Sequence, residues 1–175
     1  MSAELIVFLS GAAGLAFVFR RYLTRPGRHE FWRLWAFVGL LGLACLSARS
    51  WFVDSARPGQ LLSWIVLALS AGVAVVAGRQ LRRGGRPERG IEPTTVLVTD
   101  GVYRYLRHPL YLSLLLLAAG IWLKSVSWVS TGVAAATFLA IGQTIRTEEN
   151  ELMAQFGEAY SEYRARVKAI LPWLV

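Results

Sequence analysis

Arg107, His108 and Pro109 stand directly before an apolar run, in the stretch Y-R-Y-L-R-H-P-L-Y-L-S of residues 103–113. Proline is favoured as the first residue of a helix, where its missing N–H needs no partner. It also keeps the preceding His108 out of helical geometry. The pattern therefore predicts a helix that begins abruptly at Pro109. Its free N–H groups, the positive end of its dipole and the Arg107 guanidinium would together suit an anion.

The same basic pair has a simpler interpretation, in which Arg107 extends to the lipid headgroups and His108 caps the helix. A lone basic pair does not decide between an anchor and a binding site. Tyr103, Tyr105 and Tyr111 surround the pair and are equally ambiguous. They could be interfacial aromatic residues or flat walls for a planar ligand.

A second candidate group is the acidic cluster Glu148-Glu149-Asn150-Glu151. Acidic residues in the first turn of a helix are favoured by its dipole, which would account for the cluster by itself. The tail that follows is predicted to be an amphipathic helix, because apolar residues recur at spacings of three and four. These residues are Leu152, Phe156, Tyr160, Tyr163 and Val167. Glu149 projects near the middle of this apolar stripe, where a carboxylate is costly unless it has a partner.

These residues need elements to position them, and the composition indicates membrane helices. The chain has 175 residues, is 55% hydrophobic and carries a net charge of +8, with a mean hydropathy of +0.44. High hydropathy and high charge must then be segregated along the chain. Five apolar segments are predicted to span the membrane, at about residues 3–19, 31–48, 61–78, 110–123 and 126–145. Spanning takes about 20 residues, so the fourth segment is short, and the second requires Arg33 to extend to the interface.

Only Lys124 and Ser125 separate the fourth and fifth segments, which predicts a tight helical hairpin. Small residues early in the fifth segment would allow close helix approach. The predicted fold is all-α: one polytopic membrane domain over residues 1–175, with about five transmembrane helices and a C-terminal amphipathic helix.

Lys and Arg are distributed unevenly between the predicted links. Sixteen of the 19 lie after the first and third segments or in the tail, and three lie on the other side. The positive-inside rule then predicts an external N-terminus and a cytoplasmic C-terminus, in what we expect to be a bacterial inner membrane. Because topology and membrane lipids account for the basic residues, no nucleic-acid partner is expected. Cys45 is the single cysteine, and neither a disulfide nor a metal site is predicted.

Two predicted cytoplasmic stretches are longer than connection requires, namely the loop 79–109 and the tail 146–175. Glycine and proline interrupt the first half of the loop, and long irregular loops are often functional. The short hairpin would return Glu148 and Glu149 to the membrane face that carries Arg107 and His108. The sequence therefore predicts that the two stretches form one site.

Together, the two stretches resemble the isoprenylcysteine carboxyl methyltransferase family and its relatives, the phospholipid N-methyltransferases and other small integral-membrane methyltransferases. The first motif is Leu97-Val98-Thr99-x-Gly101-x-Tyr103-x-x-x-Arg107-His108-Pro109-x-Tyr111. The second, after the hairpin, is Arg146-x-Glu148-Glu149-x-x-Leu152-x-x-x-Phe156-Gly157-x-x-Tyr160-x-x-Tyr163. The similarity covers roughly residues 90–172. Many relatives carry glycine where this chain has Ser113, which is still small enough for close helix packing.

The resemblance implies S-adenosylmethionine as methyl donor, held at the cytoplasmic face. The implied cofactor-binding residues are Gly101, Tyr103, Arg107, His108, Pro109, Tyr111, Glu148 and Glu149. The donor's α-carboxylate would suit Arg107 and the helix start. Its ribose diol and ammonium would suit Glu148 or Glu149, and its adenine would suit aromatic faces.

The implied reaction is an in-line displacement, for which the protein excludes water and aligns the reactants. A carboxylate acceptor would need only orientation, by Arg104 or Arg107. An amine or thiol acceptor would also have to lose a proton, for which His108 or Glu149 is a candidate. A lipid-like or prenylated acceptor is expected, with carboxylate O-methylation favoured. Phospholipid N-methylation and thiol S-methylation are the alternatives.

Two other classes of function stay open. A membrane reductase that uses NADPH is one, because sterol-reductase-type proteins carry a similar Arg-His-x-x-Tyr signature, although they are usually much longer. A non-enzymatic membrane adaptor is the other, with the motifs acting as helix caps and interface anchors. The sequence makes no prediction of the oligomeric state.

Overall fold

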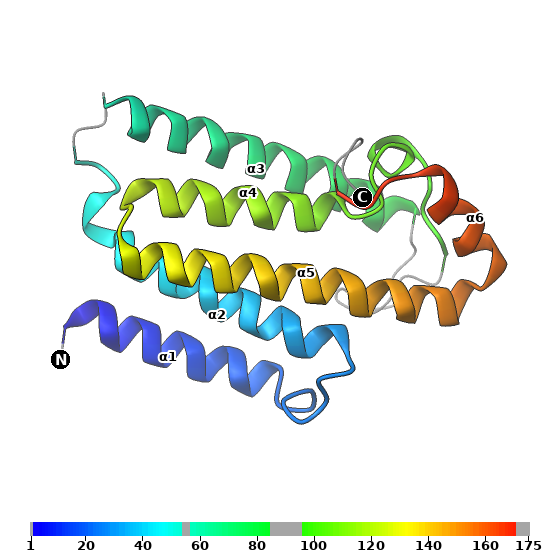
Figure 1. Cartoon of the computed structure of the whole chain (residues 1–175), viewed down its shortest axis with the longest axis horizontal. Helices are drawn as coiled ribbons and strands as arrows, with labels where there is room; N and C mark the ends of the chain where they lie inside the picture. The colour runs from blue at the N-terminus through cyan, green and yellow to red at the C-terminus, as the bar shows by residue number, and fades with distance from the viewer. Residues whose placement is uncertain (1, 54–56, 85–95, 171–175) are drawn as a thin grey trace.

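The architecture is a bundle of helices, seen in a computed structural model that describes residues 2–53, 57–84 and 96–170. The helices are α1 (Ala3–Val18), α2 (His29–Ser47), α3 (Pro58–Gly84), α4 (Pro109–Lys124), α5 (Trp128–Phe156) and α6 (Glu158–Arg166). There are also two short 3₁₀ helices in the described residues: η1 (Ala48–Ser50) follows α2, and η2 (Gly101–Arg104) precedes α4. The first five α-helices lie lengthwise beside one another, and α6 folds back at one end (Figure 1). The predicted all-α fold is confirmed.

Membrane character is concentrated in α2, α3 and α5, which are long and apolar enough to cross a bilayer. The helices α1 and α4 are apolar but have only 16 residues each. Hydrocarbon exposure is tolerated by a helix because its backbone groups are paired internally. The length and composition of these helices identify an integral membrane protein, and the number of spans stays a prediction.

α4 packs mainly against α3, and small residues allow the close approach. The Ser63 hydroxyl donates to the Gly120 carbonyl at 2.7 Å, and the Ser70 hydroxyl donates to the Ser113 carbonyl at 2.7 Å. Small residues with interhelical hydrogen bonds are typical of helix pairs in lipid. Close packing is thus retained at Ser113, which is buried.

Replacing Gly120 by alanine tests this interface. A Cβ atom there would lie 2.8 Å from the Leu67 side chain and 3.3 Å from its backbone nitrogen. Overpacking of this kind costs about 1–3 kcal/mol, so we expect Gly120→Ala to lower the unfolding temperature in detergent. Gly72→Ala on α3 is the matched control, because a Cβ at Gly72 meets no neighbour within 4 Å. Equal unfolding temperatures for the two variants would contradict the packing described.

α5 follows α4 after the three residues 125–127, so the connection is short, as predicted, although Lys124 belongs to α4 and not to the connection. The main packing partner of α5 is α2. A capping box of Ser127 and Ser130 starts the helix. Farther along, Gly39 of α2 approaches Thr137 so closely that a Cβ at Gly39 would overlap its hydroxyl. The bundle is therefore built from the pairs α3–α4 and α2–α5, with smaller contacts between α1 and α2 and between α4 and α5.

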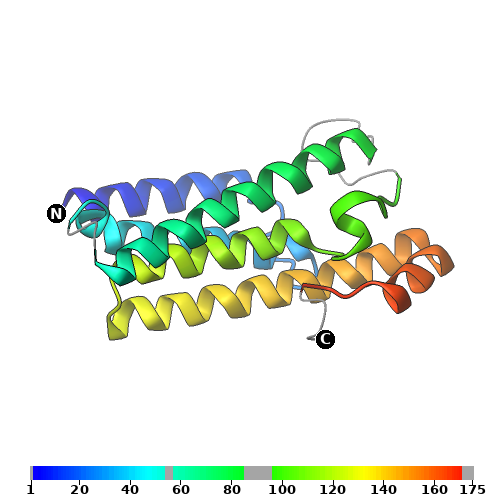
Figure 2. The same cartoon turned by 90° about the horizontal axis from the view of Figure 1, so that it is seen from above.

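The predicted amphipathic tail helix is divided in two. α5 continues past the acidic cluster to Phe156, and Gly157, with φ +55°, ends it before α6 begins. Glycine takes positive φ at no steric cost, which makes it the usual residue at such a break. Tyr160 and Tyr163 consequently lie on α6, and the chain after α6 turns back toward the start of α4 (Figure 1 and Figure 2).

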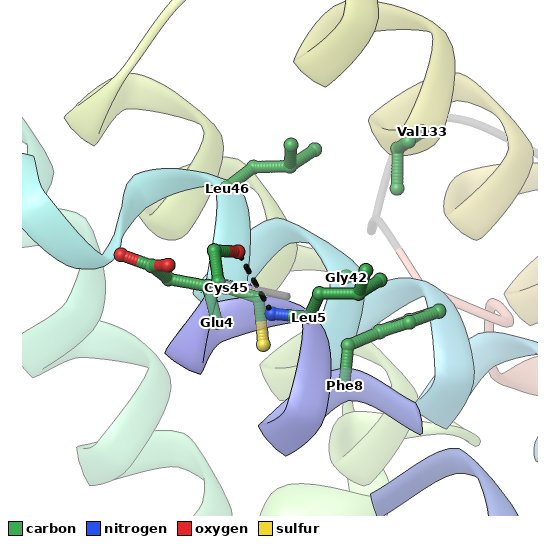
Figure 3. Close-up of a pocket in the computed structure, with 8 residues that line it drawn as sticks. Glu4, Leu5, Phe8, Gly42, Cys45, Leu46 and Val133 are labelled. Atoms are coloured by element: carbon green, nitrogen blue, oxygen red, sulfur yellow. Dashed lines mark hydrogen bonds between the residues drawn. The ribbon is translucent and has the colours of Figure 1, made fainter. Parts of the chain in front are cut away.

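Cys45 lines a hollow of about 330 Å³ at the end of the bundle that carries the N-terminus. α1 contributes Leu5 and Phe8 to it, α2 contributes Gly42 and Cys45, and α5 contributes Val133 (Figure 3). The hollow is thus at the opposite end from α6 and from the residues described next.

Candidate active site

The start of α4 is held by the segment that follows α6. The Arg107 N–H donates to the Lys168 carbonyl at 2.8 Å, and the His108 N–H donates to the Ala169 carbonyl at 2.9 Å. Leu106 and Lys168 form an isolated parallel bridge. The amides of Arg107 and His108, which precede the helix, are thus paired within the chain. These contacts also bring two segments that are 60 residues apart into one site.

The carboxylate of Glu149 is the centre of this site. Its Oε1 accepts from Arg107 Nε at 2.9 Å and from Nη2 at 2.6 Å, and it lies 3.2 Å from His108 Nε2. Its Oε2 lies 3.4 Å from Arg164 Nε. The side chains of Glu149, Arg107 and His108 are 10%, 7% and 5% exposed. Arg107 and His108 are therefore the partners that the position of Glu149 on an apolar stripe required.

The anchor interpretation of Arg107 and His108 is wrong. The side chain of Arg107 is only 7% exposed, and its Nη1 donates to the carbonyls of Arg164 and Val167. His108 occupies the N-cap position of α4 without a side-chain cap bond, and its ring lies 5.6 Å from that of Tyr111 between centroids. Arg107 thus ties together α4, α5 and the end of α6.

Glu148 faces a different set of neighbours, because consecutive residues of a helix project about 100° apart. Its Oε1 lies 3.8 Å from Arg33 Nη2, and the same nitrogen donates to the Tyr111 hydroxyl at 2.8 Å. Its Oε2 is buried and has no hydrogen-bond partner among the described residues. The site therefore holds two adjacent carboxylates, of which only Glu149 has all its oxygens engaged.

Arg33 and Arg164 are site residues that the sequence did not predict. Arg33 was expected to extend to the interface, but its side chain is only 21% exposed and points to Tyr111. The spacing of residues 33, 36, 40 and 43 could have indicated this position, because it places Arg33 on one helical face with three apolar residues. Ala36, Leu40 and Leu43 of that face are buried.

Three buried tyrosines hold η2 and α6 together. The Tyr163 hydroxyl donates to the Tyr103 carbonyl at 2.5 Å, and the Tyr103 hydroxyl donates to the Ala77 carbonyl of α3 at 3.4 Å. Tyr160 packs against Tyr163 with ring centroids 6.1 Å apart. Burial raises the pKa of Tyr163 to about 12 and raises the pKa values of Tyr103 and Tyr160 above the usual range. These phenols are therefore neutral at physiological pH and act as packing and hydrogen-bonding groups.

Gly101 and Arg104 lie outside the Glu149 cluster. Gly101 has φ +60°, and a Cβ there would overlap the side-chain amide of Gln80 on α3. The Gln80 Oε1 accepts from the Val102 N–H at 2.9 Å. Gly101 thus sets the position of η2, on which Arg104 is exposed.

A further cluster, His29, Glu30 and Glu151, offers three possible metal-ligand atoms within 4.8 Å of one another. Glu151 Oε2 lies 2.7 Å from His29 Nδ1, and its Oε1 accepts from the His29 N–H at 3.1 Å. Glu151 thereby satisfies a free amide at the start of α2. Arg28 Nη2 lies 3.3 Å from Glu30 and 3.5 Å from Glu151. Ion pairing and helix capping account for this cluster, which joins α2 to α5.

Comparison with known proteins matches residues 59–159 to the family model described as phospholipid methyltransferase. A protein-S-isoprenylcysteine O-methyltransferase of Schizosaccharomyces pombe is 37% identical over 78 residues, which are 44% of this chain and 33% of that protein. One from Dictyostelium discoideum is 34% identical over 80 residues, 44% of this chain and 33% of that protein. A methanethiol S-methyltransferase of Crocosphaera subtropica is 35% identical over 77 residues, 43% and 29% of the respective chains.

The matched part of the chain spans about a third of the length of these relatives. No solved structure matches the chain significantly. The family model, in contrast, covers more than half of the chain and includes both Arg107-His108 and Glu148-Glu149. The chain therefore belongs to the phospholipid methyltransferase family.

Proposed function

We propose that the chain is an S-adenosylmethionine-dependent methyltransferase of the membrane, acting on a lipid-like or prenylated acceptor. The observation that carries this proposal is the buried cluster of Arg107, His108 and Glu149 beside Glu148, inside the family-matched segment. Relatives named as isoprenylcysteine O-methyltransferase and methanethiol S-methyltransferase support methyl transfer as the reaction class. Carboxylate O-methylation is favoured, because it requires no proton acceptor.

The residues present fit the polar groups of S-adenosylmethionine. The cofactor carries an ammonium group and ribose hydroxyls, which are hydrogen-bond donors. Glu148 Oε2, a buried acceptor without a partner among the described residues, suits such a donor. Arg107 supplies positive charge for its carboxylate, and Tyr111 supplies an aromatic face. When bound, the cofactor supplies a methyl group activated by a sulfonium centre.

The protein's own residues would bind and orient the cofactor and the acceptor, and would exclude water. Arg107 and His108 keep Glu149 in place, and the chain after α6 covers the start of α4. Arg104, exposed on η2, is proposed to orient the carboxylate of an acceptor. For an amine or thiol acceptor, His108 is the candidate proton acceptor, since its Nε2 lies 3.2 Å from the Glu149 carboxylate.

An apolar groove between α3 and α4 supports a lipophilic acceptor. It has a volume of about 610 Å³, and its lining includes Leu69, Val76 and Leu112. Leu106 and Pro109 also line it, and they flank Arg107 and His108 in the chain. An apolar tail in the groove would therefore place a polar end group at the start of α4.

We further propose that the start of α4 and α6 face the cytoplasm of a bacterial inner membrane. The distribution of Lys and Arg between the links supports this orientation. A topology reporter fused after Val175 should give a cytoplasmic signal, and an external signal would overturn the orientation.

The decisive experiment is methyl transfer from labelled S-adenosylmethionine by the purified full chain in detergent. A panel of prenylcysteines, phospholipids and small thiols separates the three acceptor chemistries. A carboxyl methyl ester releases labelled methanol in base, whereas N-methyl and S-methyl products do not. Stoichiometric binding of NADPH without binding of S-adenosylmethionine would favour a reductase, and binding of neither would favour an adaptor.

A further inference from the structure

Arg33 reaches the site from α2, outside the family-matched residues 59–159. Its Nη2 donates to the Tyr111 hydroxyl of α4 at 2.8 Å and lies 3.8 Å from Glu148 Oε1 of α5. The guanidinium carbon lies 5.9 Å from the centroid of the Tyr111 ring. Both neighbours belong to the motifs shared with the family, but Arg33 itself does not.

A largely buried arginine requires compensation, because removing a cation from water is costly. The hydroxyl of Tyr111 is neutral and satisfies only one donor. Glu148 is the nearest carboxylate recorded for Arg33 and supplies the opposite charge. Tyr111 also interacts with the Glu148 carboxylate. Arg33, Tyr111 and Glu148 thus form a three-membered polar set from three different helices.

The two consecutive carboxylates have different roles in this arrangement. Glu149 has both oxygens engaged, Oε1 by Arg107 and His108 and Oε2 by Arg164. The ion pair of Glu148 with Arg33 is at Oε1, and its Oε2 has no hydrogen-bond partner in the described part of the chain. Glu149 therefore acts as an internal tie, and Glu148 is the carboxylate with an acceptor left for a ligand.

We propose that Arg33 is a positioning residue that orients Glu148, through Tyr111, to accept a hydrogen bond from the ammonium group of the cofactor's amino-acid part. This inference rests on the proposed function. It assigns to α2, which lies outside the family-matched segment, a share in the recognition of the cofactor. Arg33 itself does not touch the reacting atoms.

The test compares two ligands of the purified full chain. S-adenosylhomocysteine carries the amino-acid part, and 5′-methylthioadenosine lacks it. We expect Arg33→Gln to weaken binding of the first by about 10- to 100-fold, which corresponds to the loss of one charge-assisted contact. Binding of 5′-methylthioadenosine should change by less than about threefold, as expected for a change that does not touch the groups binding this ligand. Arg33→Lys should recover part of the loss, since lysine keeps the charge but not the planar fork.

Tyr111→Phe gives a second route to the same result. It should produce the same selective loss, and the double variant with Arg33→Gln should lose no more than the larger single loss, because the two side chains act through one contact. Arg28→Gln is the matched control. Arg28 also lies at the start of α2, but it pairs with Glu30 and Glu151 and is 47% exposed. Its replacement should leave both affinities unchanged.

Equal losses for the two ligands would show a general packing role and would overturn the inference. Unchanged affinity for S-adenosylhomocysteine in both Arg33→Gln and Tyr111→Phe would also overturn it. These outcomes differ from failure of the proposed function, in which the unmodified chain binds neither ligand. The unfolding temperature of each variant without ligand separates loss of fold from loss of recognition.

Discussion

Replacing Glu149 by glutamine should abolish measurable cofactor binding and methyl transfer. The change leaves Arg107 and His108 buried beside a neutral amide. Breaking a buried ion pair on one side costs about 3–5 kcal/mol, because the remaining charge is uncompensated. If the binding-competent arrangement bears that cost, affinity falls by more than about 100-fold. Calorimetric titration with S-adenosylhomocysteine measures the loss.

The same change should loosen the segment after α6. Arg107 also donates to the carbonyls of Arg164 and Val167, so its displacement weakens two contacts of that segment. Faster amide hydrogen exchange over residues 158–170 would report this loosening. Arg107→Ala should have the same two effects, and the double variant should be little worse than either, because the two side chains act as a unit.

Glu151→Gln is the matched control for Glu149→Gln. Glu151 lies two residues farther along α5, but its carboxylate pairs with His29 and Arg28 at the start of α2. Its replacement should lower the unfolding temperature and leave cofactor affinity within about twofold. Wild-type affinity in both Glu149→Gln and Arg107→Ala would show that the buried cluster is not the cofactor site.

The positions of α1, α2 and α4 followed closely from the sequence, because hydropathy and a proline start signal are local properties. The end of α5 did not follow from the sequence. The fifth span was predicted to end near residue 145, where Arg146 indicates the interface, but the helix continues to Phe156. A charged residue marks a membrane boundary without ending a helix, and the first residue that breaks this one is Gly157, with φ +55°.

Part of the site was also predictable, because it depends on a local property of the sequence. Glu149 on an apolar stripe required a partner, and that requirement is readable from periodicity alone. The identity of the partner was not predicted, since Arg107 lies 42 residues away. Arg33 and the carbonyls of Lys168 and Ala169 were missed because only tertiary packing brings them to the start of α4. An arginine at the end of an apolar run has the same local sequence whether it extends to headgroups or into the bundle.

Gly101→Ala should disrupt the site from a distance, through the position of η2. At φ +60° an alanine costs about 1–2 kcal/mol in the backbone alone. Its Cβ would also displace Gln80, which accepts from the Val102 N–H. Because η2 leads directly into Arg107 and His108, we expect cofactor affinity to fall by at least about tenfold, measured by the same titration.

Gly157→Ala separates the backbone cost of Gly101→Ala from the cost of its overlap with Gln80. Gly157 has φ +55° and ψ −125°, but a Cβ there meets no neighbour within 4 Å, so only a backbone cost of about 1–3 kcal/mol applies. Adding Gln80→Ala to Gly101→Ala should recover part of the affinity, because it removes the overlap while the backbone cost and the lost Val102 bond remain. If Gly101→Ala binds the cofactor as well as Gly157→Ala does, the packing of Gln80 against Gly101 does not position the start of α4.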